Sequence, residues 1–171
     1  MITKISPADA ADFSTIQNLM SLYLFEHSAR LERDVDSDGL FHYDGLEAYW
    51  RLSGRYAFLT RADDQLAGFA LVLDRAQLDP GLTGHVIAEF FILPRLRRRG
   101  IGREAAFALF NLFAGAWWIP IAGWNTDAQL FWRRVVQEYT RGQCIEERWS
   151  GDSEEGVAWF FEAGPARAPS P

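Results

Sequence analysis

The sequence predicts an α/β (α+β) fold in which about four helices flank a sheet of about seven strands. The chain has 171 residues, of which 49% are hydrophobic and 23% charged, and these values suit one globular domain with a single core. Segments with the two-residue period of strands alternate along the chain with segments of helical spacing. In one place an apolar strand leads through a short glycine loop directly into a helix, as in α/β folds.

The first third of the chain predicts one strand and two helices. Residues 2–6 have the pattern of a short strand, and either Ser6 or Asp9 can cap the helix that follows. The apolar positions of that helix recur every three or four residues, at Phe13, Ile16, Leu19, Met20, Tyr23 and Leu24. Residues 26–45 are rich in acidic side chains, and we expect a loop with broken structure there. Residues 46–52 predict a second short helix.

The rest of the chain predicts a hairpin, the strand before the glycine loop, and a final alternation of helix and strand. The expected strands are 55–61, 65–73, 86–93, 117–122, 143–149 and 157–161, and the expected helices are 102–114 and 125–138. Asp63 and Asp64 form the hairpin turn. We therefore expect one domain over residues 1–163. Residues 164–171 are mainly proline and small residues, which predicts a disordered tail.

A basic glycine loop follows the strand 86–93 and Pro94. It contains Arg97, Arg98, Arg99, Gly100, Ile101, Gly102 and Arg103. At a helix N-terminus, free backbone N–H groups and the positive end of the helix dipole point at one place. Glycines at 100 and 102 let the backbone approach an anion without an intervening Cβ. The sequence therefore predicts a site for a phosphorylated cofactor.

Two common phosphate-binding motifs do not fit this loop. A Walker A loop ends in Gly-Lys-Ser/Thr, and that tripeptide is absent. A dinucleotide site needs a carboxylate at the tip of the next strand, where this chain has Gly123-Trp124-Asn125. The run from Arg97 to Gly102 instead resembles the R/Q-x-x-G-x-G/A pyrophosphate loop of the GCN5-related N-acetyltransferase (GNAT) family. The resemblance extends to Glu89 and to Asn125 with Ala128, and covers roughly residues 55–140.

The resemblance implies a mixed, splayed sheet, acetyl-CoA as the cofactor, and acetyl transfer to the amine of a small molecule or a peptide. Backbone N–H groups of residues 98–103 would bind the pyrophosphate. Arg97 or Arg99 would add charge-assisted bonds of about 1.5–3 kcal/mol each. Main-chain groups of Ile92 and Leu93 would pair with the pantetheine arm.

Glu89 is the candidate catalytic residue. A carboxylate in an apolar strand is costly to bury and needs a partner or a task. Burial would raise its pKa toward the range useful to a general base, the role that the family resemblance implies. The alternative is a structural salt bridge to an arginine or a bond to a neighbouring hydroxyl. Asn125 resembles the asparagine that contacts the pantetheine in relatives, and it could equally be only a helix N-cap.

The chain departs from the family pattern at Trp132. Many members carry a tyrosine seven residues after the asparagine as general acid for the thiolate, and an indole N–H is far too weak an acid for that work. Tyr139, expected to lie in the core, is the nearest tyrosine; otherwise another residue or water protonates the thiolate, or turnover is slow. A catalytically silent acyl-CoA-binding or regulatory domain therefore remains an alternative. A nucleotide-binding domain that uses the loop for another phosphate is a third.

Charge and composition argue against nucleic acids, metal ions and membranes as binding partners. The net charge of −6 argues against nucleic-acid binding, because phosphates require a basic surface. The three histidines and the single cysteine, Cys144, show no metal-ligand spacing. No apolar run is long enough to span a bilayer and the start does not resemble a signal peptide, so we expect a cytoplasmic protein without membrane contact. Both a monomer and a homodimer are compatible with the sequence.

The acidic segment 26–45 lies where the family places its acceptor groove. Its aspartates at 34, 36 and 38 could attract a cationic amine, and rings at Tyr43, Tyr49 and Trp50 could line the groove. A solvated surface loop is the alternative.

Overall fold

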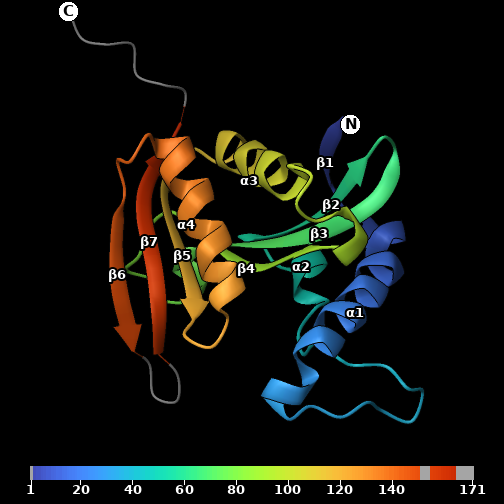
Figure 1. Ribbon diagram of the computed structural model, residues 1–171. Helices are drawn as coiled ribbons and strands as arrows, with labels where there is room; N and C mark the ends of the chain where they lie inside the picture. Colours follow the sequence, from blue (N-terminus) through green and yellow to red (C-terminus); the bar gives the residue numbers. More distant parts are fainter. Residues whose placement is uncertain (1, 151–154, 165–171) are drawn as a thin grey trace, which may run out of the picture.

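The computed structural model describes residues 2–150 and 155–164, which form a seven-stranded sheet with helices on both faces (Figure 1). The strands are β1 (Thr3–Pro7), β2 (Arg55–Ala62), β3 (Gln65–Asp74), β4 (His85–Ile92), β5 (Gly115–Ala122), β6 (Ile145–Ser150) and β7 (Glu155–Ala163), in the order β1-β2-β3-β4-β5-β7-β6. Only β4 and β5 run parallel, and every other pair of neighbours is antiparallel. The predicted mixed α/β sheet is confirmed.

Helices cover each face of the sheet. They are α1 (Phe13–Leu31), α2 (Ala48–Arg51), α3 (Ile101–Leu112) and α4 (Thr126–Thr140), with 3₁₀ turns η1 (Ala10–Asp12), η2 (Arg75–Gln77) and η3 (Pro94–Leu96). α1 and α2 pack on one face of β2 to β4, and α3 and α4 pack on the opposite face of the sheet. The sheet therefore separates two hydrophobic cores.

Strand β3 shows how the sequence fills both cores. Ala70 and Val72 face the core under α3 and α4, and Phe69 and Leu71 face the core under α1 and α2. Successive side chains of a strand point to opposite faces, so a strand buried on both faces needs apolar residues at every position. This is why residues 66–73 form a continuous run without a polar side chain.

The first helix is longer than the sequence predicts: α1 continues through residues 26–31, where we expected a loop. The helix ends where Glu32 adopts a left-handed conformation with φ of 50°. The N–H of Arg33 then donates to the carbonyl of Ser28 at 3.1 Å, a closure that satisfies a helix C-terminus. Acidic and basic side chains on the exposed side of this last stretch imitated the composition of a loop.

The other predicted elements are confirmed, with ends that differ by a few residues. Asp9 does not cap α1 itself but the 3₁₀ turn η1 before it, where its Oδ1 accepts from the N–H of Ala11 at 2.7 Å. The N-cap of α1 is Asp12, which makes no side-chain cap bond. Asp63 and Asp64 have φ values of 46° and 63°, as a tight two-residue hairpin requires. The predicted joint between the last two strands lies partly in 151–154, and the predicted tail beyond Gly164 lies in 165–171, both outside the described residues.

Gly68 lets β4 lie close to β3, and it provides a test of the sheet. A Cβ at this position would lie 1.9 Å from the carbonyl oxygen of Phe91, in backbone that cannot move aside. We expect Gly68→Ala to lower the free energy of unfolding by about 3 kcal/mol, the upper range of overpacking, as measured by urea denaturation. Gly81→Ala is the control, because its Cβ would lie 3.4 Å from the nearest atom, Oδ1 of Asp79. Equal losses in the two variants would contradict this account.

Candidate active site

The candidate site lies where β4 and β5 separate. Only two residue pairs join these strands, His85 with Trp117 and Val86 with Trp118. The N–H of Gly123 donates to the carbonyl of Glu155 at the start of β7, so the N–H of Gly123 points toward β7. Backbone N–H groups point to alternate sides along a strand, and Pro120 is three residues earlier. The nitrogen of Pro120 therefore faces β4. Proline has no N–H to donate, so the parallel ladder cannot continue at this point. Beyond it, the strands splay apart (Figure 1).

A β-bulge sets the direction of the Glu89 side chain. Leu71 of β3 pairs with Glu89, but the next residue, Val72, pairs with Ile87, which leaves Ala88 as an extra residue in β4. The extra residue places Glu89 on the face that α1 and α2 cover, at the beginning of the splay. Bulges are frequent next to active sites because they re-aim a side chain in this way.

Two tyrosines meet the Glu89 carboxylate there. Burial raises the pKa of Glu89 to about 7, while hydrogen bonds with the hydroxyls of Tyr23 and Tyr43 and the more distant charge of Arg33 oppose that rise. Burial and the charge of Glu89 in turn raise the pKa of both phenols well above the usual value, so both stay protonated. Within the described residues Glu89 forms no ion pair, so of the two structural alternatives the hydroxyl bond is present and the salt bridge is absent.

A third tyrosine extends this group away from the splay. Tyr49 of α2 forms a hydrogen bond with Tyr43, and burial, with the charge of Glu89, raises its pKa to about 12. Its ring lies under the guanidinium of Arg55 at the start of β2, 5.7 Å from centroid to Cζ. The tyrosines thus come from α1, from the 32–47 loop and from α2.

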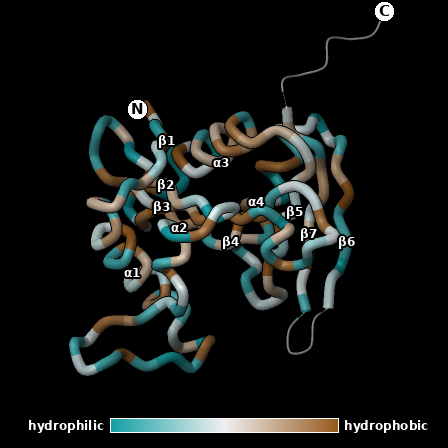
Figure 2. The backbone as a smooth tube through the Cα atoms, turned by 180° about the vertical axis from the view of Figure 1, so that it is seen from behind, coloured by the Kyte–Doolittle hydropathy of each residue, from teal (hydrophilic) through white to brown (hydrophobic). Residues whose placement is uncertain are grey.

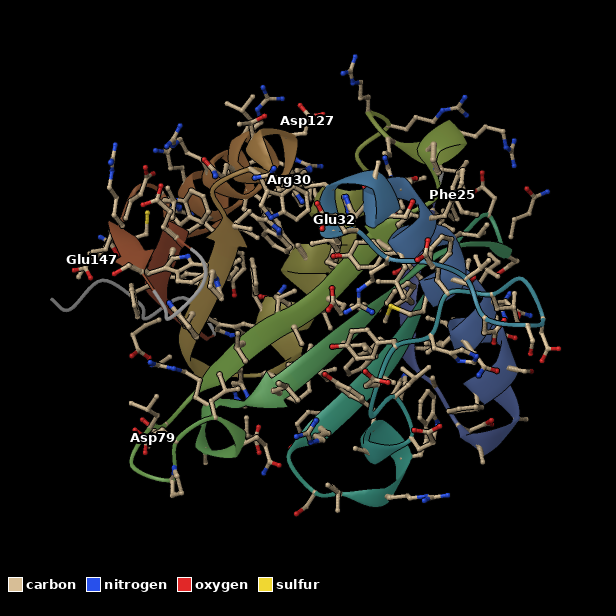
Figure 3. All side chains as sticks on the ribbon, turned by 90° about the horizontal axis from the view of Figure 1, so that it is seen from below. Phe25, Arg30, Glu32, Asp79, Asp127 and Glu147 are labelled. Atoms are coloured by element: carbon tan, nitrogen blue, oxygen red, sulfur yellow. The ribbon has the colours of Figure 1, made fainter. Side chains whose placement is uncertain are left out.

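One face of α1 contacts β4, the glycine loop and the segment after β5, which all border the splay. This face consists of Tyr23, Glu26 and His27, and we call it the bridging face. Residues three and four apart lie on one side of a helix. Tyr23 reaches Glu89 on β4, and Glu26 binds Nη2 of Arg97 through both carboxylate oxygens at 3.0 and 2.8 Å. The ring of His27 lies 5.2 Å from that of Trp124, just after β5. Figure 3 shows the end of α1, marked by Arg30 and Glu32, beside the first turn of α4, marked by Asp127.

On the other side of β4, the glycine loop presents a row of unpaired amides. Gly100 is the N-cap of α3, with φ of 85°, and no side chain caps the helix. The N–H groups of residues 100–103 donate to no acceptor within the described parts of the chain. Unsatisfied amides at a helix start favour an anion.

The arginines of this loop differ in what they contact. Nε of Arg97 donates to the carbonyl of Ile92 at 2.7 Å, and its Nη2 holds Glu26. Arg103 pairs with Glu138 at 2.7 Å. Arg98 and Arg99 are exposed and form no ion pair with any described residue. They are therefore the loop cations that are free to bind a phosphate.

The main chain before the loop is partly engaged. The N–H of Leu93 donates to Ala67 and its carbonyl accepts from Leu96, each at 2.8 Å, so both of its polar groups already have partners. By alternation, the groups that face the splay are those of Phe90 and Ile92, and the Ile92 carbonyl accepts from Arg97. The predicted pairing of Leu93 with a pantetheine arm thus has no unpartnered main-chain group to use, whereas the N–H of Ile92 is available.

Two loop residues act through packing. Ile101 is 1% exposed and belongs to a small core with Ile92 and Leu96, so only its amide faces outward. A Cβ on Gly102 would lie 3.2 Å from the ring of Phe131, so this glycine lets α3 approach α4.

The family model described as the acetyltransferase (GNAT) family matches residues 16–136. The chain belongs to the GNAT acetyltransferase family. This family uses acetyl-CoA and transfers its acetyl group. A search of curated protein sequences found no match.

Solved structures with the same fold include several acetyltransferases. An acetyltransferase from Thermus thermophilus shares 14% identity with a TM-score of 0.64, covering 95% of this chain and 97% of that one. Spermidine N-acetyltransferase from Vibrio cholerae, in complex with CoA and spermine, shares 13% with a TM-score of 0.60, covering 94% and 95%. Ribosomal-protein-S18-alanine N-acetyltransferase from Escherichia coli shares 11% with a TM-score of 0.58, covering 99% of both chains.

The structure also shows what surrounds Asn125, which matches the GNAT pattern, and Trp132, which departs from it. Oδ1 of Asn125 accepts from the N–H of Ala128 at 3.1 Å, so Asn125 is the N-cap of α4, and its Nδ2 takes no part in that bond. Trp132 is 3% exposed and packs edge-on against Phe90, with ring centroids 5.1 Å apart. It is a core residue. Tyr139 also packs in that core, as predicted.

The acidic loop after α1 is more ordered than its composition predicted. Oδ1 of Asp36 accepts from the N–H groups of Asp38 and Leu40 at 2.8 and 2.9 Å, and its other oxygen contacts His42. The loop lines an open pocket of about 300 Å³ whose charged side chains are Arg33, Asp34, Asp36 and Asp44. Figure 2 shows this loop projecting from the end of α1, with hydrophilic and hydrophobic segments in turn.

Sequence reasoning missed the role of Tyr23 and the bulge in β4. The sequence places Tyr23 on the apolar side of α1, and its helical spacing gives no sign that the hydroxyl meets a carboxylate.

Within the described residues no group of three His, Cys, Asp or Glu side chains could hold a metal ion, and none of the helices is long and apolar enough to cross a membrane.

The raised pKa of Glu89 predicts a pH dependence of stability. Between the ordinary pKa of 4.5 and about 7, the folded protein keeps this proton and the unfolded chain loses it. The folded state then binds more protons, so the free energy of unfolding falls as the pH rises through this range, by about 3 kcal/mol in total. Glu89→Gln removes this fall, as measured by urea denaturation at about pH 5 and about pH 8. Parallel profiles for wild type and variant would show that the carboxyl titrates normally.

Proposed function

We propose that this protein is an N-acetyltransferase that moves the acetyl group of acetyl-CoA to the amine of a small molecule or a peptide. One observation carries the proposal. The splay between β4 and β5 has a row of unpaired amides at residues 100–103 on one side and Glu89, with a pKa near 7, on the other. The first group suits a diphosphate and the second suits an amine.

The residues present fit coenzyme A. The amides of residues 100–103 would bind its diphosphate, and Arg98 and Arg99 would add charge. The splay-facing main chain of Phe90 and Ile92 would lie along the pantetheine arm, with Asn125 at the far side of the splay. When bound, acetyl-CoA supplies a thioester, an activated acyl group.

Glu89 would act as the general base. An amine acceptor is protonated at neutral pH and cannot attack until it loses a proton. A carboxylate with a pKa near 7 takes that proton more readily than an exposed glutamate, because its affinity for the proton is higher while a large fraction is still ionised at neutral pH.

The 32–47 loop supports an acceptor of cationic character. Asp34 and Asp44 line its pocket, and neither forms an ion pair with a described residue. Two of the structural neighbours act on spermidine and on a ribosomal-protein alanine, which are both amines. A cytoplasmic location stays a prediction, and the choice between a monomer and a homodimer stays open.

An amine library tests the proposal. Wild-type protein is mixed with acetyl-CoA and a panel of polyamines, amino acids and peptides, and products are detected by mass spectrometry together with release of free thiol. We expect one class of amine to be acetylated, and Glu89→Gln to lower kcat by about 10²-fold or more. CoA binding without turnover on any amine would instead favour the silent acyl-CoA-binding domain, an alternative that the buried Trp132 supports.

The loop predicts which arginines bind the cofactor. Arg98→Ala combined with Arg99→Ala should raise the Kd for CoA by about 10²-fold or more, because two charge-assisted bonds of about 1.5–3 kcal/mol each are lost. Isothermal titration calorimetry measures this change. Arg95→Ala is the matched control, since Arg95 is exposed on η3 and also forms no ion pair with a described residue. A comparable loss in the control would mean that only overall charge matters.

A further inference from the structure

Acetyl transfer from a thioester to an amine requires a proton donor as well as a base, because the sulfur departs as a thiolate. The donor must lie at the splay. Resting on the function proposed above, we propose that Tyr23 of α1 donates the proton to the departing sulfur and recovers one from Glu89.

Two of the five tyrosines are excluded by position. The hydroxyl of Tyr139 donates to Oδ1 of Asn111 at 2.9 Å, at the exposed edge of the contact between α3 and α4. The hydroxyl of Tyr56 lies 3.4 Å from Oδ2 of Asp74, and Oδ1 of the same carboxylate contacts His85 at the amino end of β4. Both lie away from the segment where β4 leaves β5.

Three tyrosines remain around Glu89, and their surroundings distinguish them. Tyr49 forms its hydrogen bond with Tyr43, not with Glu89, and its ring lies under Arg55 at the start of β2. Tyr43 forms a hydrogen bond with Glu89 and another with Tyr49, and Tyr49 lies on the side of Tyr43 away from the splay. The contacts of Tyr23 extend toward the splay instead.

The bridging face of α1 holds Tyr23 in that position. Its ring lies 4.9 Å from the ring of His27, which lies 5.2 Å from the ring of Trp124 beyond β5. Edge contacts with Phe69 and Phe91, at 6.2 and 5.8 Å, fix the other side of the ring. Tyr23 is thus the one tyrosine in contact with Glu89 whose packing reaches across the opening, within the described residues.

The proton transfers balance. Glu89 takes one proton from the acceptor ammonium, and the neutral amine attacks the acetyl carbonyl. As the carbon–sulfur bond breaks, its electron pair stays on sulfur, which takes the phenolic proton of Tyr23, and Tyr23 takes the proton that Glu89 holds. The new amide nitrogen gives up its second proton to the freed Glu89, which releases it to water. One proton ends on the thiol and one in solution.

The leaving-group dependence of Tyr23→Phe tests this assignment. With acetyl-CoA we expect kcat to fall about 10²-fold, the scale of a lost general acid. With an acetyl ester of an acidic aryl thiol, whose thiolate departs unprotonated, the ratio of wild type to variant should approach one. Both substrates are measured on the same preparation, so a smaller folded fraction cancels. An equal loss on both substrates would show a structural role and overturn the proposal, as would no loss on acetyl-CoA.

A second readout uses the free protein. The Tyr23 hydroxyl lowers the pKa of Glu89, so Tyr23→Phe should raise it in a carboxyl-carbon NMR titration without cofactor. An unchanged pKa would remove the contact on which the proposal depends. Tyr43→Phe is the matched control: it should also raise the Glu89 pKa but leave the leaving-group dependence as in wild type. Wild-type protein that acetylates no amine would defeat the proposed function, whereas an active wild type with an unaffected Tyr23→Phe defeats only this assignment.

Discussion

The early end of pairing between β4 and β5 is the constraint on which the candidate site depends. A seven-stranded sheet gains from every backbone hydrogen bond, yet these two central strands share only two residue pairs. Pro120 removes the donor that the next step of the ladder requires, without disturbing the opposite edge, where β5 stays paired with β7 along its length. The splay is therefore encoded in one strand, and the main chain of β4 is left facing an opening instead of a neighbour.

An opening in the middle of a sheet must be held open and covered, and α1 does both. Its bridging face contacts β4, the glycine loop and the segment after β5 within little more than one helical turn. The pair of Glu26 with Arg97 is partly exposed, with 26% and 42% of the side chains accessible, so it contributes little to global stability. Its consequence is positional: it joins α1 to the segment that precedes the unpaired amides.

Much of the fold could be predicted because its signals are local. Glycines beside arginines after an apolar strand specify a helix start with free amides, and Asp63-Asp64 between apolar runs specifies a hairpin. The partners of Glu89 could not be predicted, since Tyr23 and Tyr43 lie far from it in sequence and nothing local distinguishes a core tyrosine from one bonded to a carboxylate. The engagement of Arg97 by Glu26 was equally hidden, because composition assigned residues 26–31 to a loop and not to the last turns of α1.

The choice of partners explains how the partly buried Glu89 carboxylate can stay reactive. An arginine beside Glu89 would stabilise the ionised form and push its pKa down, which would weaken it as a base. Phenols satisfy the carboxylate oxygens without bringing a charge, so burial still dominates and the pKa remains near 7. Arg97, a cation of the glycine loop, is held by Glu26 and by the Ile92 carbonyl. The ion pair with Glu26 thus engages the guanidinium of Arg97 away from Glu89, and Tyr23 and Tyr43 provide the hydrogen bonds of the Glu89 carboxylate.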